Sequence, residues 1–209
     1  YLIYVLLATV CDVMPLRKLN RLIALNALKN FDITKNLPLN TLFKLNEKKN
    51  KIDINDLGYL IGPILNAGGR LGKSQYATEL LSSNNDLVVN DRSKSLIKLN
   101  DKRKEIENLI LEEIDFKKIE KENKDVIIYY NPNINEGLIG IIAARLKDYF
   151  NKPSFVITAS NELLKGSARS IYNYNIGRVI KNSLDKNIII KGGGHNMAAG
   201  FTLDKVNLK

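Results

Sequence analysis

The sequence predicts an α/β protein in two parts that are joined by a long charged helix. Three observations predict this class: an apolar run opens the chain, a stretch without proline or glycine follows at 93–123, and short apolar runs then alternate with helical patterns. Strands and helices that alternate pack as helices on a sheet. We therefore expect a first part at 1–92, a connecting helix at 93–123 and a mixed-sheet α/β domain at 124–209.

The first part opens with YLIYVLLATVC, which predicts a buried strand that ends at Asp12. A carboxylate at a strand end suits a divalent metal, because hard cations take oxygen ligands. The alternative is a cap for the next segment. RKLNRLIALNALKNF then predicts a packing helix, and the polar segment 34–50 predicts a helix and loop on the surface. The apolar face of the packing helix would consist of Leu19, Leu22, Ile23, Ala27 and Leu28.

A glycine cluster, GPILNAGGRLG at 62–72, carries Asn66 and Arg70. It predicts either a tight turn between helices or a surface that touches a substrate backbone, and the glycines favour the turn. QYATELLSS after it is helical again. The stretch 93–123 has a narrow apolar stripe on a highly charged helix, which is typical of a connection between two domains.

Seven segments follow in the second part, and we expect a sheet with helices packed on it. They are DVIIYYN (strand), GLIGIIAARLKDYF (helix), SFVIT (strand), LLKGSARS (strand or turn), NIGRVIKNSL (helix), NIII (strand) and GFTL (strand). The helix of GLIGIIAARL would begin near a cap at Asn135, and its small residues, Gly137 and Gly140 among them, allow close packing of another backbone or of a ligand.

The segment KGGGHNMAAGF places three glycines, Gly192, Gly193 and Gly194, directly before the only histidine, His195. With NIII as a strand and HNMAAG as a helical turn, the glycines would aim backbone N–H groups at one point. That arrangement predicts phosphate binding or a structural turn. His195 could contact phosphate or ligate a metal, and its place after the glycines favours phosphate.

The segment KGSARS combines two cations with two hydroxyls around small residues. Arg169 can form bidentate bonds to phosphate, and Lys165, Ser167 and Ser170 supply further donors. Strand alternation would set Ser167 and Arg169 on one face. Together with the glycines, this segment predicts contact with a nucleic-acid backbone.

Composition supports a polyanionic partner, since the net charge is +10 and the isoelectric point is about 9.5. That partner is either nucleic acid or an anionic membrane surface.

The single cysteine, Cys11, excludes an internal disulfide and a multi-thiolate zinc site, and it fits a reducing compartment. No apolar run approaches the roughly 18 residues of a membrane span, so we expect a cytoplasmic protein without a membrane partner. The chain begins inside an apolar run, which suggests the carboxyl portion of something longer.

Five segments occur in the same order as in a known family: ATVCDVMPL, GPILNAGGRLG, NEGLIGIIAARL, GSARS and GGGHNMAAGFTL. On these motifs, and on the LNDKRKEIE stretch of the connecting helix, the chain resembles the RecJ exonucleases of the DHH phosphoesterase superfamily. The resemblance implies the last part of a DHH catalytic domain at 1–92 and a DHH-associated, nucleic-acid-binding domain at 124–209. It implies 5′-to-3′ hydrolysis of single-stranded DNA with Mn²⁺ or Mg²⁺, in DNA repair and recombination.

By the motif match, Asp12 would be a metal ligand, and Ser167, Arg169, the three glycines and His195 would contact the DNA strand. The family's D-x-D and D-H-H clusters do not occur in this sequence, so we expect the chain alone to be inactive and an upstream DHH-domain polypeptide to be its partner. Ile64 stands where the family has arginine, and Asn135 where it usually has histidine. The alternatives are a non-catalytic module that binds single-stranded nucleic acid, and a phosphoesterase of short oligonucleotides or cyclic dinucleotides.

Overall fold

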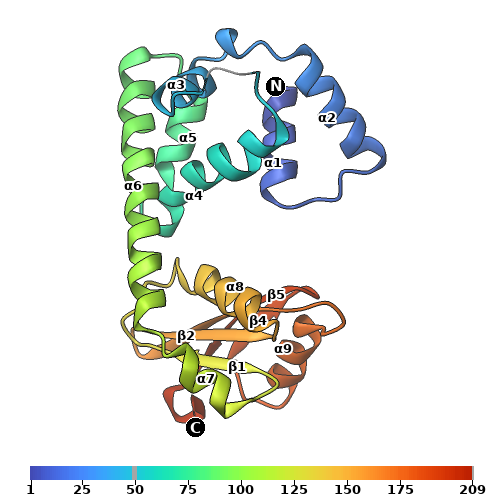
Figure 1. Ribbon diagram of the computed structural model, residues 1–209, viewed down its shortest axis with the longest axis vertical. Helices are drawn as coiled ribbons and strands as arrows, with labels where there is room; N and C mark the ends of the chain where they lie inside the picture. Colours follow the sequence, from blue (N-terminus) through green and yellow to red (C-terminus); the bar gives the residue numbers. More distant parts are fainter. Residues whose placement is uncertain (49–50, 209) are drawn as a thin grey trace. The chain divides into compact units, whose positions relative to one another are not determined.

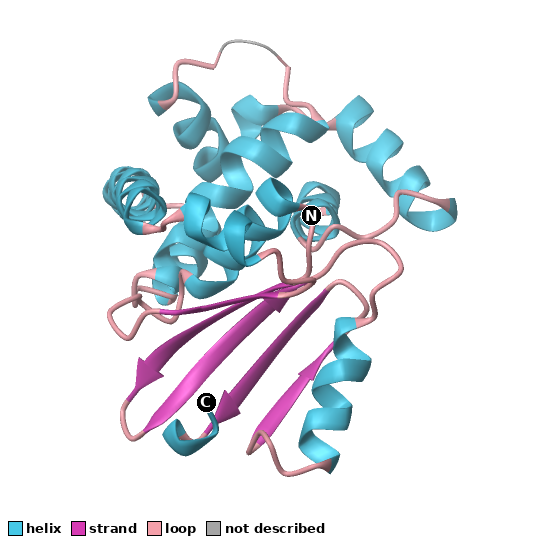
Figure 2. Cartoon of the chain, turned by 60° about the horizontal axis from the view of Figure 1, so that its bottom comes forward, coloured by secondary structure: helices cyan, strands magenta, loops and turns pink. Residues whose placement is uncertain are grey.

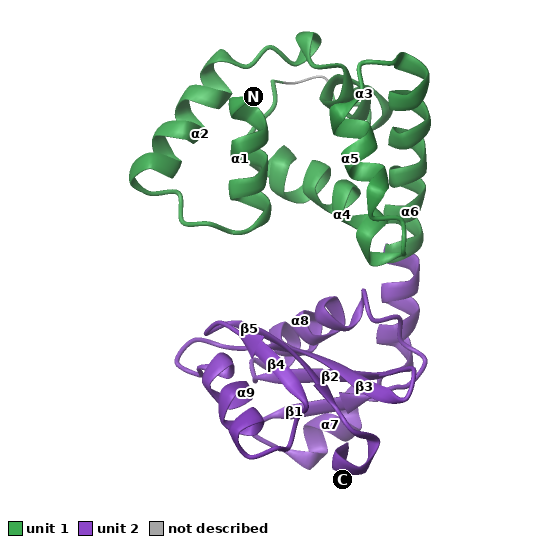
Figure 3. Ribbon diagram, turned by 180° about the vertical axis from the view of Figure 1, so that it is seen from behind, with its two compact units in different colours: residues 1–103 green, residues 104–209 purple. Residues whose placement is uncertain are grey.

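A computed structural model describes residues 1–48 and 51–208, so the end of the segment expected at 34–50 lies outside the described residues. The chain forms two compact units, residues 1–103 and 104–209 (Figure 3). Unit 1 is helical in all its described elements. These are α1 (Leu2–Cys11), α2 (Lys18–Asn30), η1 (Ile33–Lys35), α3 (Leu37–Leu45), the π-helical η2 (Asp56–Ile61), α4 (Gly62–Arg70), α5 (Gln75–Ser82) and the first part of α6 (Asp86–Glu113) (Figure 1).

The opening apolar segment is the helix α1, and the strand that we expected there was wrong. An apolar run that is hydrophobic almost throughout carries no period, so its pattern alone does not separate a buried strand from a buried helix. Only the structure reveals the helical period, because the buried side chains Ile3, Leu6 and Leu7 are spaced three and four residues apart. Asp12 therefore follows a helix, and it does not lie at the carboxyl edge of a sheet.

The helix α2 packs in the core of unit 1 as predicted, although part of its expected apolar face is exposed, and α3 does not have the surface position that we expected. α2 is a helix as predicted, but it buries Ala24 and Ala27, while Leu19 and Leu22 are 67% and 64% exposed. α3 was expected on the surface and instead packs in the core of unit 1. Its buried side chains are Pro38, Leu39, Thr41, Leu42 and Phe43. Hydrophobic side chains of α2 thus remain uncovered in this unit.

The glycine cluster is mostly helical, so the tight turn that we favoured for it was wrong except at its end, where Gly72 has a φ of +78°. Two glycines of the helix α4 allow neighbouring atoms to lie closer to its backbone than a side chain would permit. A Cβ on Gly62 would lie 2.7 Å from Sγ of Cys11, and one on Gly68 would lie 2.6 Å from the Lys73 carbonyl oxygen. Ile64 is 1% exposed and belongs to the core, so this position does not face solvent.

The long charged helix is present as α6, which starts earlier than expected and ends at Glu113. Asp115 then caps α7 (Phe116–Glu122), because its Oδ1 accepts a hydrogen bond of 2.9 Å from the backbone N–H of Lys118. None of the helices in the part of the chain that the structure describes is both long and apolar enough to cross a bilayer.

Unit 2 contains a five-stranded mixed sheet, which confirms the predicted α/β class (Figure 2). Its order is β1 (Ile127–Tyr130), β2 (Ser154–Ser160), β3 (Leu163–Arg169), β5 (Ala198–Leu203) and β4 (Lys191–Gly194). β1 and β2 are parallel, and the other neighbours are antiparallel. α8 (Ile139–Phe150), α9 (Ile176–Asp185) and the short η3 (Lys205–Leu208) complete the unit with α7.

The two faces of this sheet carry different helices. On one face Val156 packs with Ile142 and Leu146 of α8, and we call it the α8 face. On the other, the α9 face, Leu164 and Phe201 pack with Ile180 and the rest of α9. The α8 helix contacts β2 and β3, whereas α9 contacts β4 and β5.

The segments before and after the three glycines do not have the secondary structure that we expected. NIII is irregular rather than a strand, because Asn187 adopts a left-handed φ of 55° after α9 and turns the chain. The glycines themselves form the strand β4, and HNMAAG supplies a turn and the start of β5 instead of a helix. The idea of a glycine turn at a helix N-terminus is therefore wrong.

Candidate nucleic-acid interface

The strand β3 places its polar side chains on the α8 face. Along β3 every second residue is buried, so Leu164 and Ala168 point to the α9 face, and Lys165, Ser167 and Arg169 point to the other. The KGSARS segment thus lies in regular strand geometry up to Arg169.

The glycine strand contributes to the same face through one residue. Ser167 is paired with Gly200, and Gly200 is paired with Gly193. Directly paired residues of antiparallel strands point to one face, so these three form a row, which we call the glycine row. Neighbouring strands are about 4.8 Å apart, which places Gly193 about 10 Å from Ser167. A Cβ on Gly193 would meet nothing within 4 Å, so this end of the row is open.

The other two glycines of β4 serve packing on the α9 face. A Cβ on Gly192 would lie 2.7 Å from Cγ2 of Ile180, and one on Gly194 would lie 2.4 Å from the Ala198 carbonyl oxygen. Only Gly193 of the three therefore offers its backbone on the face that carries Arg169.

The guanidinium of Arg169 is held at the end of β3. Its Nη1 donates to Oγ of Ser167 at 3.1 Å and to the Ala168 carbonyl oxygen at 2.9 Å. Within residues 1–48 and 51–208, no carboxylate lies in ion-pair range of it. Partial burial lowers the pKa of Arg169 from its ordinary value, and an arginine remains charged after such a shift. The remaining N–H donors of this cation are suited to phosphate oxygens.

The helix α8 approaches this pair of side chains closely at Gly140. A Cβ there would lie 2.9 Å from Nη2 of Arg169 and 3.1 Å from Oγ of Ser167. The sequence pattern suggested that small residues of this helix make room for another backbone or for a ligand. At Gly140 the space is taken by the Arg169 side chain.

Lys165 and Ser170 already have partners. Nζ of Lys165 lies 2.5 Å from Oε2 of Glu136, and Ser160 donates to the same carboxylate. The hydrogen bonds from Lys165 and Ser160 lower the pKa of Glu136. Ser170 is 1% exposed and donates to the Tyr174 carbonyl oxygen at 2.5 Å, so its hydroxyl makes a structural contact where we expected phosphate.

His195 lies in the turn between β4 and β5, beside a depression of about 770 Å³. Its backbone N–H donates to the Ala198 carbonyl oxygen at 2.8 Å, and its carbonyl oxygen accepts from Gly177 at 3.1 Å. Arg178 and Lys181 of α9 line the same depression. We missed these two cations in the sequence, although their spacing of three on a predicted helix places them on one side.

The expected residues of unit 1 lie on two helices. Asp12 is exposed at the end of α1, where its N–H donates to the Ala8 carbonyl oxygen at 2.9 Å. Burial, followed by the charge of Asp12, raises the pKa of the neighbouring Cys11 thiol. Asn66 is exposed and Arg70 half-exposed, and their spacing of four sets them on one side of α4.

The donors present do not form a site for Mn²⁺ or Mg²⁺. Such ions take several oxygen ligands at once. In the described ranges 1–48 and 51–208, no group of three or more histidine, cysteine, aspartate or glutamate side chains could hold a metal ion. Asp12 offers one carboxylate, which does not by itself fit the group.

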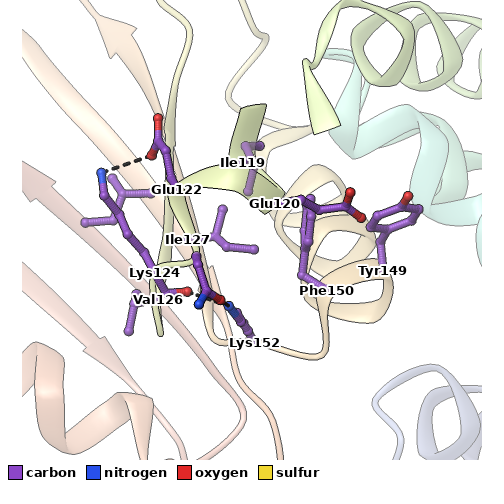
Figure 4. Close-up of a pocket in the computed structure, with 11 residues that line it drawn as sticks. Ile119, Glu120, Glu122, Lys124, Val126, Ile127, Tyr149, Phe150 and Lys152 are labelled. Carbon is purple, nitrogen blue, oxygen red and sulfur yellow. Dashed lines mark hydrogen bonds and ion pairs between the residues drawn. The ribbon is translucent and has the colours of Figure 1, made fainter. Parts of the chain in front are cut away.

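A separate cavity of about 350 Å³ lies in unit 2 between α7, β1 and the end of α8 (Figure 4). Ile119, Ile127 and Phe150 line it, and Lys124 pairs with Glu122 at 3.0 Å at its edge. None of the residues singled out in the sequence lies among its lining residues.

Comparison with known proteins agrees with this architecture. Residues 123–209 match the model of the DHHA1 domain family. The chain is 35% identical over 209 residues to the single-stranded-DNA-specific exonuclease RecJ of Haemophilus influenzae, covering 95% of this chain and 36% of that protein. It is 32% identical over 215 residues to RecJ of Escherichia coli, covering 98% and 37%. The chain is thus similar to RecJ over nearly all of its own length, and it spans about a third of the length of these two proteins.

Solved structures share the fold. The crystal structure of RecJ from Thermus thermophilus in complex with Mg²⁺ superposes with a TM-score of 0.81 at 24% identity, over 96% of this chain and 31% of that one. A structure of exonuclease RecJ bound to manganese gives a TM-score of 0.73 at 24% identity, over 96% and 50%. Divalent ions are therefore present in those related proteins.

Proposed function

We propose that this chain is the nucleic-acid-binding portion of a RecJ-type 5′-to-3′ exonuclease of single-stranded DNA that acts in DNA repair and recombination. The observation that carries the proposal is the position of Arg169 and Gly193 on one face of one sheet, with Ser167 and Gly200 between them. The relatives named above are described as exonucleases specific for single-stranded DNA.

A single strand would bind across β3, β5 and β4 by its backbone. Arg169 donates to phosphate oxygens, and the Ser167 hydroxyl adds a weaker donor. Gly200 and Gly193 carry no side chain, so a strand can approach the main chain closely. Because such contacts address phosphate and sugar, they predict binding that depends little on base sequence.

The other residues that we expected to contact DNA contribute unequally to the proposed interface. His195 with Arg178 and Lys181 provides a second basic region at the turn between β4 and β5. Lys165 is neutralised by Glu136 and contributes less than Arg169. Ser170 is bonded internally and is left out of the proposed interface.

Hydrolysis belongs to the complete enzyme in this proposal. Two divalent ions would activate water and stabilise charge on the phosphate when bound there. This sequence has one histidine and neither a D-x-D nor a D-H-H cluster, and Asp12 supplies no more than one ligand. We therefore propose that an upstream DHH-domain polypeptide completes the metal site, and that the chain alone does not cleave DNA.

Binding of labelled single-stranded DNA, measured by fluorescence anisotropy between 50 and 200 mM salt, tests the first part. We expect affinity to fall steeply with salt, because each neutralised phosphate releases counterions (slope about −0.7 per phosphate). Arg169→Ala should weaken binding by roughly tenfold or more, the range of a hydrogen bond to a charged group. Lys205→Ala, which removes one exposed cation from η3, is the matched control.

Absence of binding at low salt, or equal effects of the two substitutions, would contradict the proposed interface. The second part is tested with 5′-labelled DNA and Mn²⁺. We expect no product from the chain alone and release of nucleotides after addition of a polypeptide that carries both missing clusters. Robust hydrolysis by the chain alone would refute the proposed division of labour.

A further inference from the structure

The strand β1 forms one edge of the sheet in unit 2, and it takes no part in the interface described above. On its inner side, the N–H of Ile127 donates to the Pro153 carbonyl oxygen at 2.9 Å, and β1 runs parallel to β2. The backbone groups of successive residues point to opposite sides of a strand, so those of Ile128 and Tyr130 point away from β2. Among residues 1–48 and 51–208, no hydrogen bond reaches these outward groups.

The sequence of this edge lacks the features that usually prevent a strand edge from pairing. Natural edge strands carry charges, proline or a bulge for this purpose. β1 reads IIYY, and its outward-facing Ile128 and Tyr130 are 67% and 41% exposed. The opposite edge, β4, begins with a lysine and continues with three glycines, which have low strand propensity. Of the two edges, β1 is therefore the one suited to an additional strand.

Two cavities meet at the β1 edge. The first is the cavity of about 350 Å³ between α7, β1 and the end of α8, which we call the α7 cavity (Figure 4). The second, of about 320 Å³, lies on the α9 face and is lined by Phe155, Tyr174 and Leu208 among others. We call it the α9-face cavity. Val126 and Ile128 line both cavities, so the edge of β1 separates them.

We propose that β1 accepts an extended peptide segment of another protein as an additional strand, and that this segment carries apolar side chains on both of its faces. Successive side chains of a strand point to opposite faces, so alternate ones would enter the α7 cavity and the α9-face cavity. The outward backbone groups of Ile128 and Tyr130 would pair with the peptide main chain. This surface goes beyond the proposed function and does not depend on it.

The charges at this edge disfavour nucleic acid as the occupant. Glu120 and Glu122 line the α7 cavity and would repel phosphate. The cations there are already engaged, because Lys124 pairs with Glu122 at 3.0 Å and Nζ of Lys152 donates to the Lys124 carbonyl oxygen at 2.8 Å. An apolar peptide needs no charged partner, so it fits this lining.

A second copy of this chain fits the edge less well than a free peptide does. In the β1 strand of another copy, Ile127 is 4% exposed and Tyr129 packs against the core under α8, so their own unit holds both side chains. The other two, Ile128 and Tyr130, point to the α9 face. The α7 cavity would then stay unfilled. A segment that is not part of a sheet has free side chains on both faces.

A fluorescein-labelled peptide of the sequence SFVITAS tests the proposal by fluorescence anisotropy with the full chain. This is the sequence of β2, which pairs with the inner side of β1 and is apolar on both faces. We expect saturable binding that depends little on salt, because the contacts include no ion pair. Tyr130→Pro removes one outward N–H, a change that edge strands tolerate. It should raise the Kd roughly 2- to 12-fold, the range of one hydrogen bond.

Ile128→Lys is a second variant, because a charge on an edge strand opposes pairing. It should raise the Kd roughly tenfold or more. Ile190→Lys makes the same change at an isoleucine that is 48% exposed and does not line either cavity, so it should bind the peptide like wild type. Circular dichroism reports folding of each variant. In the wild-type chain, hydrogen exchange of the Ile128 and Tyr130 amides should slow when the peptide is added.

Three results would each overturn this inference: no saturable binding of the peptide, unchanged binding by the folded Tyr130→Pro and Ile128→Lys proteins, or binding without slower exchange at residues 128 and 130. Sedimentation of the wild-type chain as a dimer that Ile128→Lys dissociates would assign the edge to a second copy and would overturn it as well. The affinity of Tyr130→Pro for single-stranded DNA should stay within about twofold of wild type, since β1 lies outside the proposed interface. Failure of the peptide to bind would therefore leave the proposed function intact.

Discussion

Gly140 of α8 lies against the side chain of Arg169, so closely that a Cβ on Gly140 would be 2.9 Å from Nη2. The helix thereby limits the positions open to the guanidinium. Ser167 lies in the same contact, with its Oγ 3.1 Å from the same Cβ position. One glycine thus orients both β3 side chains of the proposed interface.

Gly140→Ala should weaken binding of single-stranded DNA and leave the chain folded. The added methyl group displaces the end of a flexible side chain, which moves Arg169 away from its position. A helix also gains up to about 1 kcal/mol when alanine replaces glycine, which offsets the steric cost. We expect the Kd to rise severalfold with a melting temperature close to that of wild type.

Anisotropy titration and thermal unfolding measure the two quantities. Arg169→Ala provides the comparison: combined with Gly140→Ala it should add no further loss, because both changes act through the same guanidinium. Independent, additive losses would show that Gly140 acts through something other than Arg169.

The sequence predicted the parts of this site that depend on local pattern. Alternation in KGSARS set Ser167 and Arg169 on one face, and β3 has that geometry. The contact between Gly140 and Arg169 joins residues far apart in the chain, so no local pattern reveals it. The pairing of Lys165 with Glu136 was missed for the same reason.

Errors in the fold arose where periodicity carries little information. The segment of α1 is apolar almost throughout, so helix and strand give the same pattern. NIII is a short apolar run, but only Ile189 of its three isoleucines is buried, because the chain turns at Asn187. The glycines 192–194 have low strand propensity, and pairing with β5 decides their conformation.

Gly193→Ala and Gly194→Ala should separate binding from folding. A Cβ on Gly193 points into open space on the α8 face, so this variant should fold like wild type and bind single-stranded DNA more weakly. A Cβ on Gly194 would lie 2.5 Å from Cβ of Ala199, so this variant must shift the backbone and should lose stability. Overpacking of this kind costs about 1–3 kcal/mol.

Urea unfolding and DNA binding, measured on both variants, check this pair. Unchanged affinity in a folded Gly193→Ala protein would mean that no strand approaches the glycine row. A Gly194→Ala protein as stable as wild type would mean that β4 and β5 are packed less closely than the structure shows.

Glu136→Gln should reduce the stability of the chain near neutral pH and have no effect in acid. Hydrogen bonds from Lys165 and Ser160 hold the pKa of Glu136 below its ordinary value of 4.5. A group with a depressed pKa in the folded state stabilises that state above its unfolded pKa, and the contribution is lost as the pH falls through the folded pKa. The Glu136 and Lys165 side chains are 43% and 44% exposed, so solvent screening limits the effect to about 0.5 kcal/mol.

Thermal unfolding at low salt, at several values between pH 7 and pH 3, measures this difference. We expect the melting temperatures of wild type and Glu136→Gln to differ most at pH 6–7 and to converge in acid, as the pH falls through the lowered pKa of Glu136 and the carboxylate becomes protonated. Glu162→Gln, at an exposed glutamate between β2 and β3, is the control and should match wild type throughout. A difference that stays constant over the whole pH range would show that the glutamine acts by geometry rather than by charge.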